Sequence, residues 1–295
     1  MENQNKSRLL PMILIVIFFG VCCAGILVYH SVTVSKENAT ESEYDSIRNE
    51  IYSVSMEETA VADSSEDTDA KMPSREELIE TFLSECGNRS LYEEYFYAKV
   101  PSFDVLRENN SDTIGYLEIP GTEISYPILQ NEDNEFYLSH SITKAANANG
   151  AIYIENYNME DFSDSVTPVY GHHLLNGKLF GSLTDYRDAE YGKEHPYFLI
   201  YTDKDIHVYE IVLTSKYSTE HLLADAFEET DDGKFMYAGM DDDYGAKLIE
   251  KIKQYGYRGT GGSGNEVNAG DKLVILSTCC DNSTHRFLVV GKQLF

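Results

Sequence analysis

The segment LVILSTCCDNSTHRFLVV, residues 273–290, decides the fold because it contains two short apolar runs separated by polar turn residues. Residues 273–276 and 286–290 are rich in β-branched and aromatic side chains, which are typical of strands. We therefore expect a buried strand that continues into residues 277–280, followed by a second strand that begins at Arg286.

Further segments of the same kind lie upstream. They are separated by turn residues and cover residues 114–119, 124–129, 151–154, 197–201 and 207–213. Another apolar strand, beginning at Thr167, ends just before Gly171 and His172. Seven or eight short strands with turns between them predict a barrel or a sandwich.

Helices are expected beside these strands. Residues 73–77 have the composition of a helix start, and apolar residues then recur at helical spacing until Gly87. Further helices are expected at residues 90–98 and 243–255. The glycine-rich residues 259–264 indicate a flexible connection, because no Lys-Ser/Thr pair follows them as it would in a phosphate-binding loop.

The chain of 295 residues is strongly acidic, with 23 Lys and Arg against 50 Asp and Glu and a formal net charge of −27. Nucleic-acid binding is excluded, because it needs a basic face and the sequence has no basic patch. The chain is 42% hydrophobic, which is enough for a sizeable core. Five cysteines without a Cys-x-x-Cys pair indicate neither a zinc site nor a disulfide framework.

An uncharged apolar run of 21 residues covers residues 9–29. As a helix it would span roughly 31 Å, the thickness of the hydrocarbon core of a bilayer. Lys6 and Arg8 precede it, so the positive-inside rule places the N-terminus in the cytoplasm and the rest outside. We expect a retained anchor, because the apolar core of a cleaved signal is usually only about 7 to 15 residues long.

Residues 30–72 are rich in Ser, Thr, Glu and Asp and hold few large apolar side chains. Such a stretch buries too little surface to offset the entropy of ordering it. We predict a flexible acidic stalk with a helical patch around residues 44–51. The chain then divides into a cytoplasmic tail at residues 1–8, the membrane anchor at 9–29, this stalk, and an extracellular domain at 73–295.

Three candidate catalytic residues lie at the ends of predicted strands. Cys279 follows the strand at residues 273–276, Arg286 opens the next strand, and His172 follows a third. A thiol with a histidine and an arginine nearby has the parts of an acyl-transfer site: a nucleophile, a proton carrier and an oxyanion stabiliser. From spacing alone, a small buried cysteine and a structural histidine remain the alternatives.

At these residues the sequence resembles the sortase family, and the details are similar to class B sortases. The resemblance runs from about residue 103 to the C-terminus. It is carried by IGYLEIPGT (114–122), YPILQ (126–130), DNEFYL (133–138), YGH (170–172), GKLF (177–180) and LSTC (276–279), followed by Arg286.

The resemblance implies a mainly β fold, a closed barrel of about eight strands with N-terminal helices and a helix inserted before the cysteine strand. It implies a membrane-anchored cysteine transpeptidase on the outer face of a Gram-positive-type cell membrane. Such an enzyme cleaves a C-terminal sorting motif in secreted proteins through a thioester. It then transfers them to an amine of the lipid-linked peptidoglycan precursor. No metal or organic cofactor is expected.

The resemblance also assigns residues. Cys279 matches the nucleophile, His172 the catalytic histidine and Arg286 the catalytic arginine. The positions that line the sorting-signal groove in relatives are matched by Asn134, Leu138, Tyr170, Ser277 and Thr278.

Two neighbours depart from the family pattern. His173 replaces a polar residue, often Asn, and leaves open which imidazole acts, although the alignment with Tyr-Gly-His favours His172. Cys280 is either a passive substitution, which we favour, or the partner of Cys279 in a vicinal disulfide that would silence the enzyme. Other functions that the sequence leaves open are a pilus-type polymerase that uses a pilin lysine, a cysteine protease, and a catalytically silent membrane-tethered binding protein.

Overall fold

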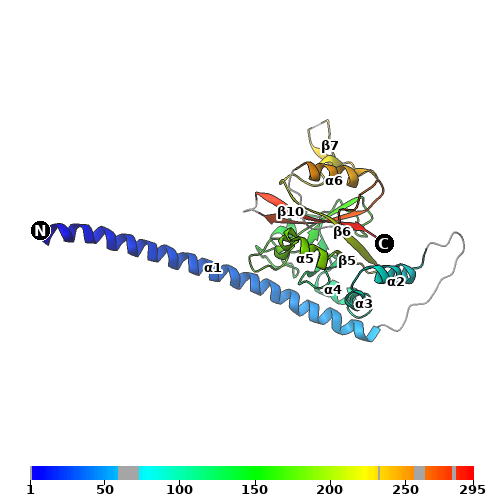
Figure 1. Cartoon of the computed structure of the whole chain (residues 1–295), viewed down its shortest axis with the longest axis horizontal. Coiled ribbons are helices and arrows are strands. Elements are labelled where there is room, and N and C mark those ends of the chain that lie inside the picture. Colours follow the sequence, from blue (N-terminus) through cyan, green and yellow to red (C-terminus); the bar gives the residue numbers. More distant parts are fainter. Residues whose placement is uncertain (1, 59–72, 232, 256–262, 281–283) are drawn as a thin grey trace.

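The computed structural model describes residues 2–58, 73–231, 233–255, 263–280 and 284–295, and within the first helix it describes the side chains of residues 22–52. Eight of the described strands close into a barrel (Figure 1). They are β1 (Thr113–Glu118), β2 (Ser125–Gln130), β3 (Tyr153–Ile154), β4 (Val166–Tyr170), β5 (Tyr197–Tyr201), β6 (Ile206–Tyr217), β9 (Leu273–Cys280) and β10 (His285–Gln293).

The strand order around the barrel is β1-β2-β3-β4-β9-β10-β6-β5, and β5 pairs with β1 to close it. The pairs β2–β3 and β4–β9 are parallel, whereas the other pairs are antiparallel. The parallel pair β4–β9 matters most for function, because it brings a strand from the middle of the chain beside the cysteine strand. The predicted eight-stranded barrel with N-terminal helices is confirmed.

Helices precede the barrel and lie between its strands. They are α1 (Glu2–Glu58), α2 (Arg75–Glu85), α3 (Arg89–Tyr97), α4 (Phe103–Asn109), α5 (Ala189–Glu194) and α6 (Tyr244–Gln254), with the short 3-10 helices η1 (Phe136–Leu138), η2 (Gly181–Arg187) and η3 (Ala224–Ala226).

The helices predicted at residues 73–87, 90–98 and 243–255 are present as α2, α3 and α6. A capping box starts α2, because Ser74 Oγ accepts from Glu77 N while the Glu77 carboxylate accepts from Ser74 N. The sequence did not predict α4, α5 or the separate hairpin of β7 (Phe227–Glu229) and β8 (Phe235–Tyr237). The predicted glycine-rich connection lies mostly outside the described residues.

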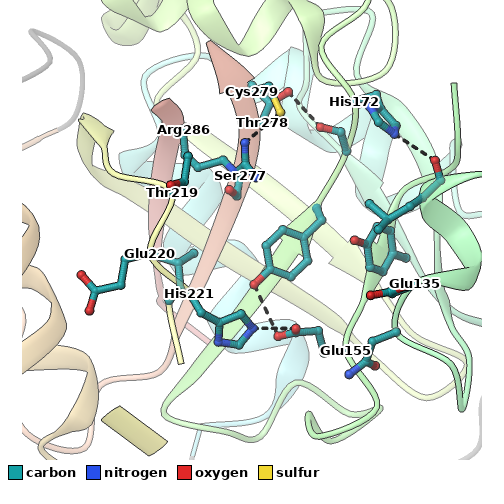
Figure 2. Close-up of a pocket in the computed structure, with 16 residues that line it drawn as sticks. Glu135, Glu155, His172, Thr219, Glu220, His221, Ser277, Thr278, Cys279 and Arg286 are labelled. Atoms are coloured by element: carbon teal, nitrogen blue, oxygen red, sulfur yellow. Dashed lines mark hydrogen bonds and ion pairs between the residues drawn. The ribbon is translucent and has the colours of Figure 1, made fainter. Parts of the chain in front are cut away.

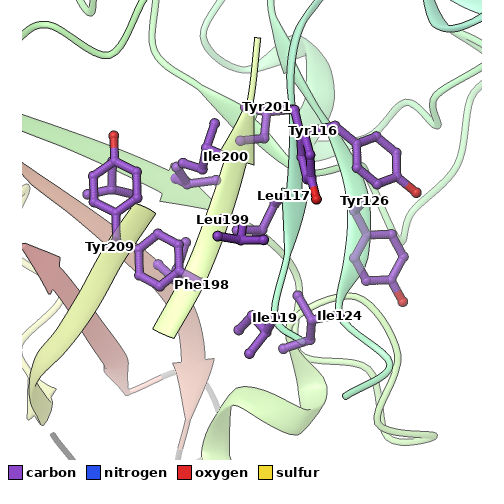
Figure 3. Packing of buried hydrophobic residues seen from close by; sticks show 14 of the residues in the cluster. Tyr116, Leu117, Ile119, Ile124, Tyr126, Phe198, Leu199, Ile200, Tyr201 and Tyr209 are labelled. Atoms are coloured by element: carbon purple, nitrogen blue, oxygen red, sulfur yellow. The ribbon is translucent and has the colours of Figure 1, made fainter. Parts of the chain in front are cut away.

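Aromatic and aliphatic side chains fill the barrel (Figure 3). Phe198 on β5 stacks on Tyr209 of β6 with ring centroids 4.9 Å apart. Its ring also covers Gly291 on β10, where a Cβ atom would lie 2.3 Å from the Phe198 ring. Only a glycine lets β10 come this close, so the ring of Phe198 seals the junction of β5, β6 and β10.

The first helix differs from the expected stalk. Over residues 33–52, α1 lies against the barrel, and the spacing of Tyr44, Ile47 and Ile51 puts these three buried side chains on one helix face. Tyr44 meets Tyr126 of β2 edge to face, with ring centroids 5.0 Å apart. The prediction of a flexible stalk is therefore wrong for this part. The composition was misleading because a helix needs few apolar residues to pack on the barrel when the polar side chains between them form hydrogen bonds to it.

Within the part of the chain that the structure describes, no helix has the length and apolar character needed to cross a membrane. Most of the span predicted at residues 9–29 lies outside the described side chains, and so does the stalk segment at 59–72.

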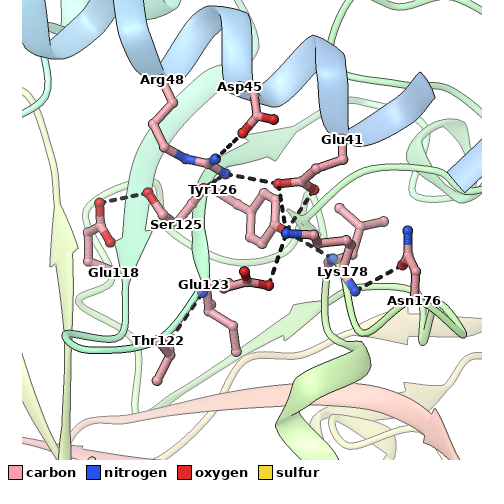
Figure 4. Close-up of polar contacts among 12 residues, drawn as sticks. Glu41, Asp45, Arg48, Glu118, Thr122, Glu123, Ser125, Tyr126, Asn176 and Lys178 are labelled. Carbon is pink, nitrogen blue, oxygen red and sulfur yellow. Dashed lines mark hydrogen bonds and ion pairs between the residues drawn. The ribbon is translucent and has the colours of Figure 1, made fainter. Parts of the chain in front are cut away.

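A buried carboxylate lies under α1 (Figure 4). Glu118 on β1 is 3% exposed and accepts hydrogen bonds from Ser125 Oγ at 2.7 Å and from the hydroxyl of Tyr52 on α1. Arg48 of the same helix donates to the carbonyl of Ser125 at 3.0 Å. Burial raises the pKa of Glu118 to about 7, although these donors and Arg48 oppose the shift.

This raised pKa predicts a pH-dependent stability. Between about pH 4.5 and 7 the unfolded chain has lost the Glu118 proton while the folded chain keeps it. The contribution of Glu118 to the free energy of unfolding therefore falls as the pH rises through this window, by on the order of 3 kcal/mol. Above about pH 7 it stays constant.

Urea denaturation at pH 5 and pH 7.5 would measure this contribution. We expect Glu118→Gln to gain stability relative to the wild-type chain as the pH rises, because glutamine does not ionise. The exposed Glu123→Gln variant, which removes a carboxylate from the same region, serves as the control. A pH dependence of Glu118→Gln equal to that of the wild-type chain would contradict the assignment.

Candidate functional site

The pairing of β9 with β10 brings a thiol and a guanidinium together. Cys279 and Arg286 are directly opposed in the antiparallel register, so their side chains lie on the same face of the sheet. Arg286 Nη1 donates to Cys279 Sγ at 2.9 Å (Figure 2). A guanidinium can only donate hydrogen bonds and keeps its charge, so the sulfur is the acceptor in this contact and lies beside a fixed positive charge.

The parallel pairing of β4 with β9 places the histidine segment beside the cysteine strand. Tyr170 is paired with Ser277, and Gly171 N donates to the Ser277 carbonyl at 3.2 Å. Thr278 Oγ1 donates to the Gly171 carbonyl at 2.8 Å. A Cβ atom at position 171 would lie 2.4 Å from Ile152 Cδ1, so the chain passes this point only because residue 171 is a glycine.

His172 follows directly and lines the same pocket as Cys279. Its Nε2 lies 3.1 Å from the carbonyl oxygen of Leu138, and a carbonyl only accepts, so Nε2 carries the proton in this contact. Gly150 packs against the ring, because a Cβ atom there would lie 2.9 Å from His172 Cδ2 and 2.4 Å from the Tyr137 carbonyl oxygen. The imidazole is thus positioned by the end of η1 and by the turn at Gly150.

His173 and Cys280, the sequence neighbours of His172 and Cys279, do not line the pocket. His173 pairs with Leu179 in a short bridge and does not line the pocket, and burial together with Arg187 lowers its pKa. Cys280 is buried in the core, because consecutive residues of a strand point to opposite faces. No disulfide bond joins Cys279 to Cys280 in the described structure.

The site residues predicted from the sequence line one cavity of about 330 Å³. All eight of them line it: Cys279, His172, Arg286, Asn134, Leu138, Tyr170, Ser277 and Thr278. The pocket brings a thiol, an imidazole and a guanidinium to one surface, and these are the groups that nucleophilic acyl transfer uses. Among the described residues, no three His, Cys, Asp or Glu side chains are grouped closely enough to hold a metal ion.

The sequence missed a contact between a histidine and a carboxylate in the pocket wall. His221 Nε2 lies 2.6 Å from Glu155 Oε1, and Tyr170 Oη donates to Glu155 Oε2 at 3.4 Å. Burial, followed by the nearby Glu155 carboxylate, raises the pKa of Tyr170, which keeps its phenol protonated as a donor. No motif could have revealed this pair, because Glu155 follows β3 and His221 lies in the loop after β6.

Comparisons with known proteins agree with this geometry. The sequence model of the Sortase domain matches residues 117–294. Sortase B of Listeria monocytogenes is 31% identical over 193 residues, which cover 63% of this chain and 72% of that protein. Sortase B of Staphylococcus aureus is 28% identical over 195 residues, covering 65% and 74%. The solved structure of the Listeria monocytogenes protein has a TM-score of 0.52 and 27% identity, covering 65% of this chain and 99% of that chain.

The contact between Arg286 and Cys279 predicts the reactivity of the thiol. Arg286→Met should slow the alkylation of Cys279 by iodoacetamide at pH 7 by about tenfold or more, since a hydrogen bond to a charged group contributes about 1.5–3 kcal/mol. Peptide mapping by mass spectrometry would follow Cys279 separately from the other cysteines. Lys292→Met removes a cation from the same strand and should leave the rate unchanged. Equal rates in the wild-type and Arg286→Met chains would refute the role of this contact.

Proposed function

This chain belongs to the class B sortases, a family of cysteine transpeptidases, and from that membership we propose that it sorts secreted proteins to the cell wall. Its substrates would be proteins with a C-terminal sorting motif, and its acceptor an amine of the lipid-linked peptidoglycan precursor. The observation that carries the proposal is the 2.9 Å contact between Arg286 and the Cys279 thiol, on a pocket that His172 also lines.

In the first half-reaction the sulfur of Cys279 attacks the carbonyl carbon of a threonine in the sorting motif. The C–S bond forms and the C–N bond breaks, while His172 gives a proton to the leaving amine. Arg286 donates to the developing oxyanion or to the substrate backbone. The product is a thioester between Cys279 and the sorted protein.

In the second half-reaction the acceptor amine attacks the thioester carbonyl. His172 takes the proton from the amine as the new C–N bond forms, the C–S bond breaks, and Cys279 leaves as the thiolate. The polar and apolar residues along the pocket, which include Asn134, Leu138 and Tyr170, would bind the motif in an extended conformation. Water in place of the amine would turn the same site into a protease.

We also propose that residues 9–29 anchor the chain in the cell membrane, with residues 1–8 in the cytoplasm and the barrel outside. This proposal is supported by the length of the uncharged apolar run and by Lys6 and Arg8 before it. An anchor fits the reaction, because the sorted protein and the lipid-linked acceptor both lie at the membrane.

Product analysis with the purified full chain tests the proposed function. A library of sorting-motif peptides would be offered with a peptidoglycan-stem amine or with a pilin lysine, and mass spectrometry would identify the joined product. A product with the stem amine supports wall anchoring. A product with the lysine alone would show pilus polymerisation instead of wall anchoring. Hydrolysis without any joined product would show a protease. No cleavage of any peptide would refute the proposal.

The cysteine pair gives a matched test. Cys279→Ala should reduce cleavage of the sorting motif by at least about a thousandfold, because the nucleophile is removed. Cys280→Ser should keep most of the activity, since Cys280 lies in the core and not on the pocket. Equal loss in both variants would contradict the passive role of Cys280.

The two histidines give a second test. His172→Ala should lower kcat by about 10²–10⁴-fold, the usual contribution of a general acid and base. His173→Ala should retain near-normal turnover, because His173 does not line the pocket. Turnover by His172→Ala with a dead His173→Ala would reverse the assignment.

A further inference from the structure

Two loops hold His172, and both are bound by α1. The first runs from Gly171 to Phe180 and carries His172 itself, and the second includes the turn of residues 147–150 that packs on the imidazole. The segment of α1 that faces them is residues 37–41, where Glu37, Thr40 and Glu41 are buried at 4%, 1% and 7% exposure. Buried polar side chains are costly unless they are bonded, so their partners matter.

Glu37 binds the loop that carries His172. Its Oε1 accepts from Leu175 N at 3.3 Å and its Oε2 from Asn176 N at 3.1 Å. The side chain of Asn176 in turn accepts from Lys178 N at 3.0 Å, which fixes the turn that the carboxylate holds. A carboxylate that accepts from two consecutive backbone amides therefore ties the backbone to α1 three and four residues after His172.

Thr40 binds the second loop. Its Oγ1 accepts from Asn147 Nδ2 and from Asn149 Nδ2, each at 2.9 Å. Gly150 N donates back to the Asn147 carbonyl at 3.0 Å, so the same turn places Gly150 against the His172 ring. Thr40 Oγ1 thus binds Asn149, and the next residue, Gly150, limits where the imidazole can lie.

Glu41 adds a third link through the barrel. Its Oε2 accepts from Tyr126 Oη at 3.0 Å, and Tyr126 Oη accepts from Leu179 N at 3.0 Å. Leu179 pairs with His173, so this chain of bonds reaches the far end of the loop that carries His172. One turn of α1 therefore binds the chain on both sides of the histidine.

We propose that Glu37 and Thr40 are positioning residues for His172, so that catalysis in this chain requires α1 to be docked on the barrel. The proposal rests on the proposed function of His172 as the proton carrier. Displacement of a catalytic group by about 1 Å can cost about 10²-fold in rate. The imidazole is held by the Leu138 carbonyl at the end of η1 and by Gly150, which lies in the turn bound by Thr40. The Cys279–Arg286 pair lies on β9 and β10, and none of the α1 contacts described above reaches it.

The test compares Glu37→Ala combined with Thr40→Val against Ser42→Ala combined with Ser46→Ala, all in the full chain in detergent. Ser42 and Ser46 are exposed residues of the same helix. We expect the first pair to lower kcat for transpeptidation by about tenfold or more with little change in KM. The alkylation rate of Cys279 should stay unchanged, which a general loss of structure would not allow. The control pair should keep wild-type kinetics.

A second readout does not depend on the sorting reaction. The rate at which diethylpyrocarbonate modifies His172, followed by mass spectrometry, reports how the imidazole is held. It should change several-fold in the first pair and not in the control pair. If the chain proves to have no transpeptidase activity, that result refutes the proposed function alone. A changed modification rate would still support the positioning role.

Conservative variants guard against a chain that fails to fold. Glu37→Gln and Thr40→Ser each retain an acceptor oxygen and should recover part of the lost kcat. Wild-type kcat together with wild-type modification of His172 in the Glu37→Ala and Thr40→Val chain would overturn the proposal.

Discussion

The register of β9 against β10 is the constraint on which the site depends. It opposes Cys279 to Arg286 and, through the neighbouring strand β4, sets the position of the histidine segment. Because side chains alternate along a strand, a slip of one residue would send Cys279 into the core and Cys280 into the pocket. Alternate apolar residues of β9 and β10 pack into two different core clusters, so a slip would exchange side chains fitted to opposite faces of the sheet. Core packing and catalytic geometry are therefore set by the same alternation.

The sequence predicts the parts of this structure that local pattern controls. The strands at residues 114–119 and 197–201 were predictable because β-branched and aromatic residues cluster there between turn residues. The helix at 243–255 was predictable because its apolar residues recur at the helical period. Cys279, His172 and Arg286 could be named from the order of short motifs, and the structure gathers them on one pocket. Their catalytic roles remain predictions.

The features that the sequence did not predict depend on contacts between distant segments. The pair of Glu155 and His221 joins a residue after β3 to one after β6, and neither has a local signal. The docking of α1 was missed for the same reason, because Glu37 and Thr40 look like stalk residues until their loop partners are known. Part of the acidic composition is thereby explained: some carboxylates, such as Glu118 and Glu37, are buried structural acceptors and not solvated charges.

The continuity of α1 has a geometric consequence. The helix is unbroken from Tyr29, the end of the apolar run, to Glu37, and at about 1.5 Å per residue this segment rises about 12 Å. If residues 9–29 span the bilayer as proposed, this helical segment holds the barrel at a fixed height above the membrane. Each residue inserted into that segment would raise the barrel and also turn it by about 100°. The height of the pocket and the direction in which it faces are then coupled. The length of this helical segment cannot change without turning the pocket toward or away from the membrane, where the proposed lipid-linked acceptor would lie.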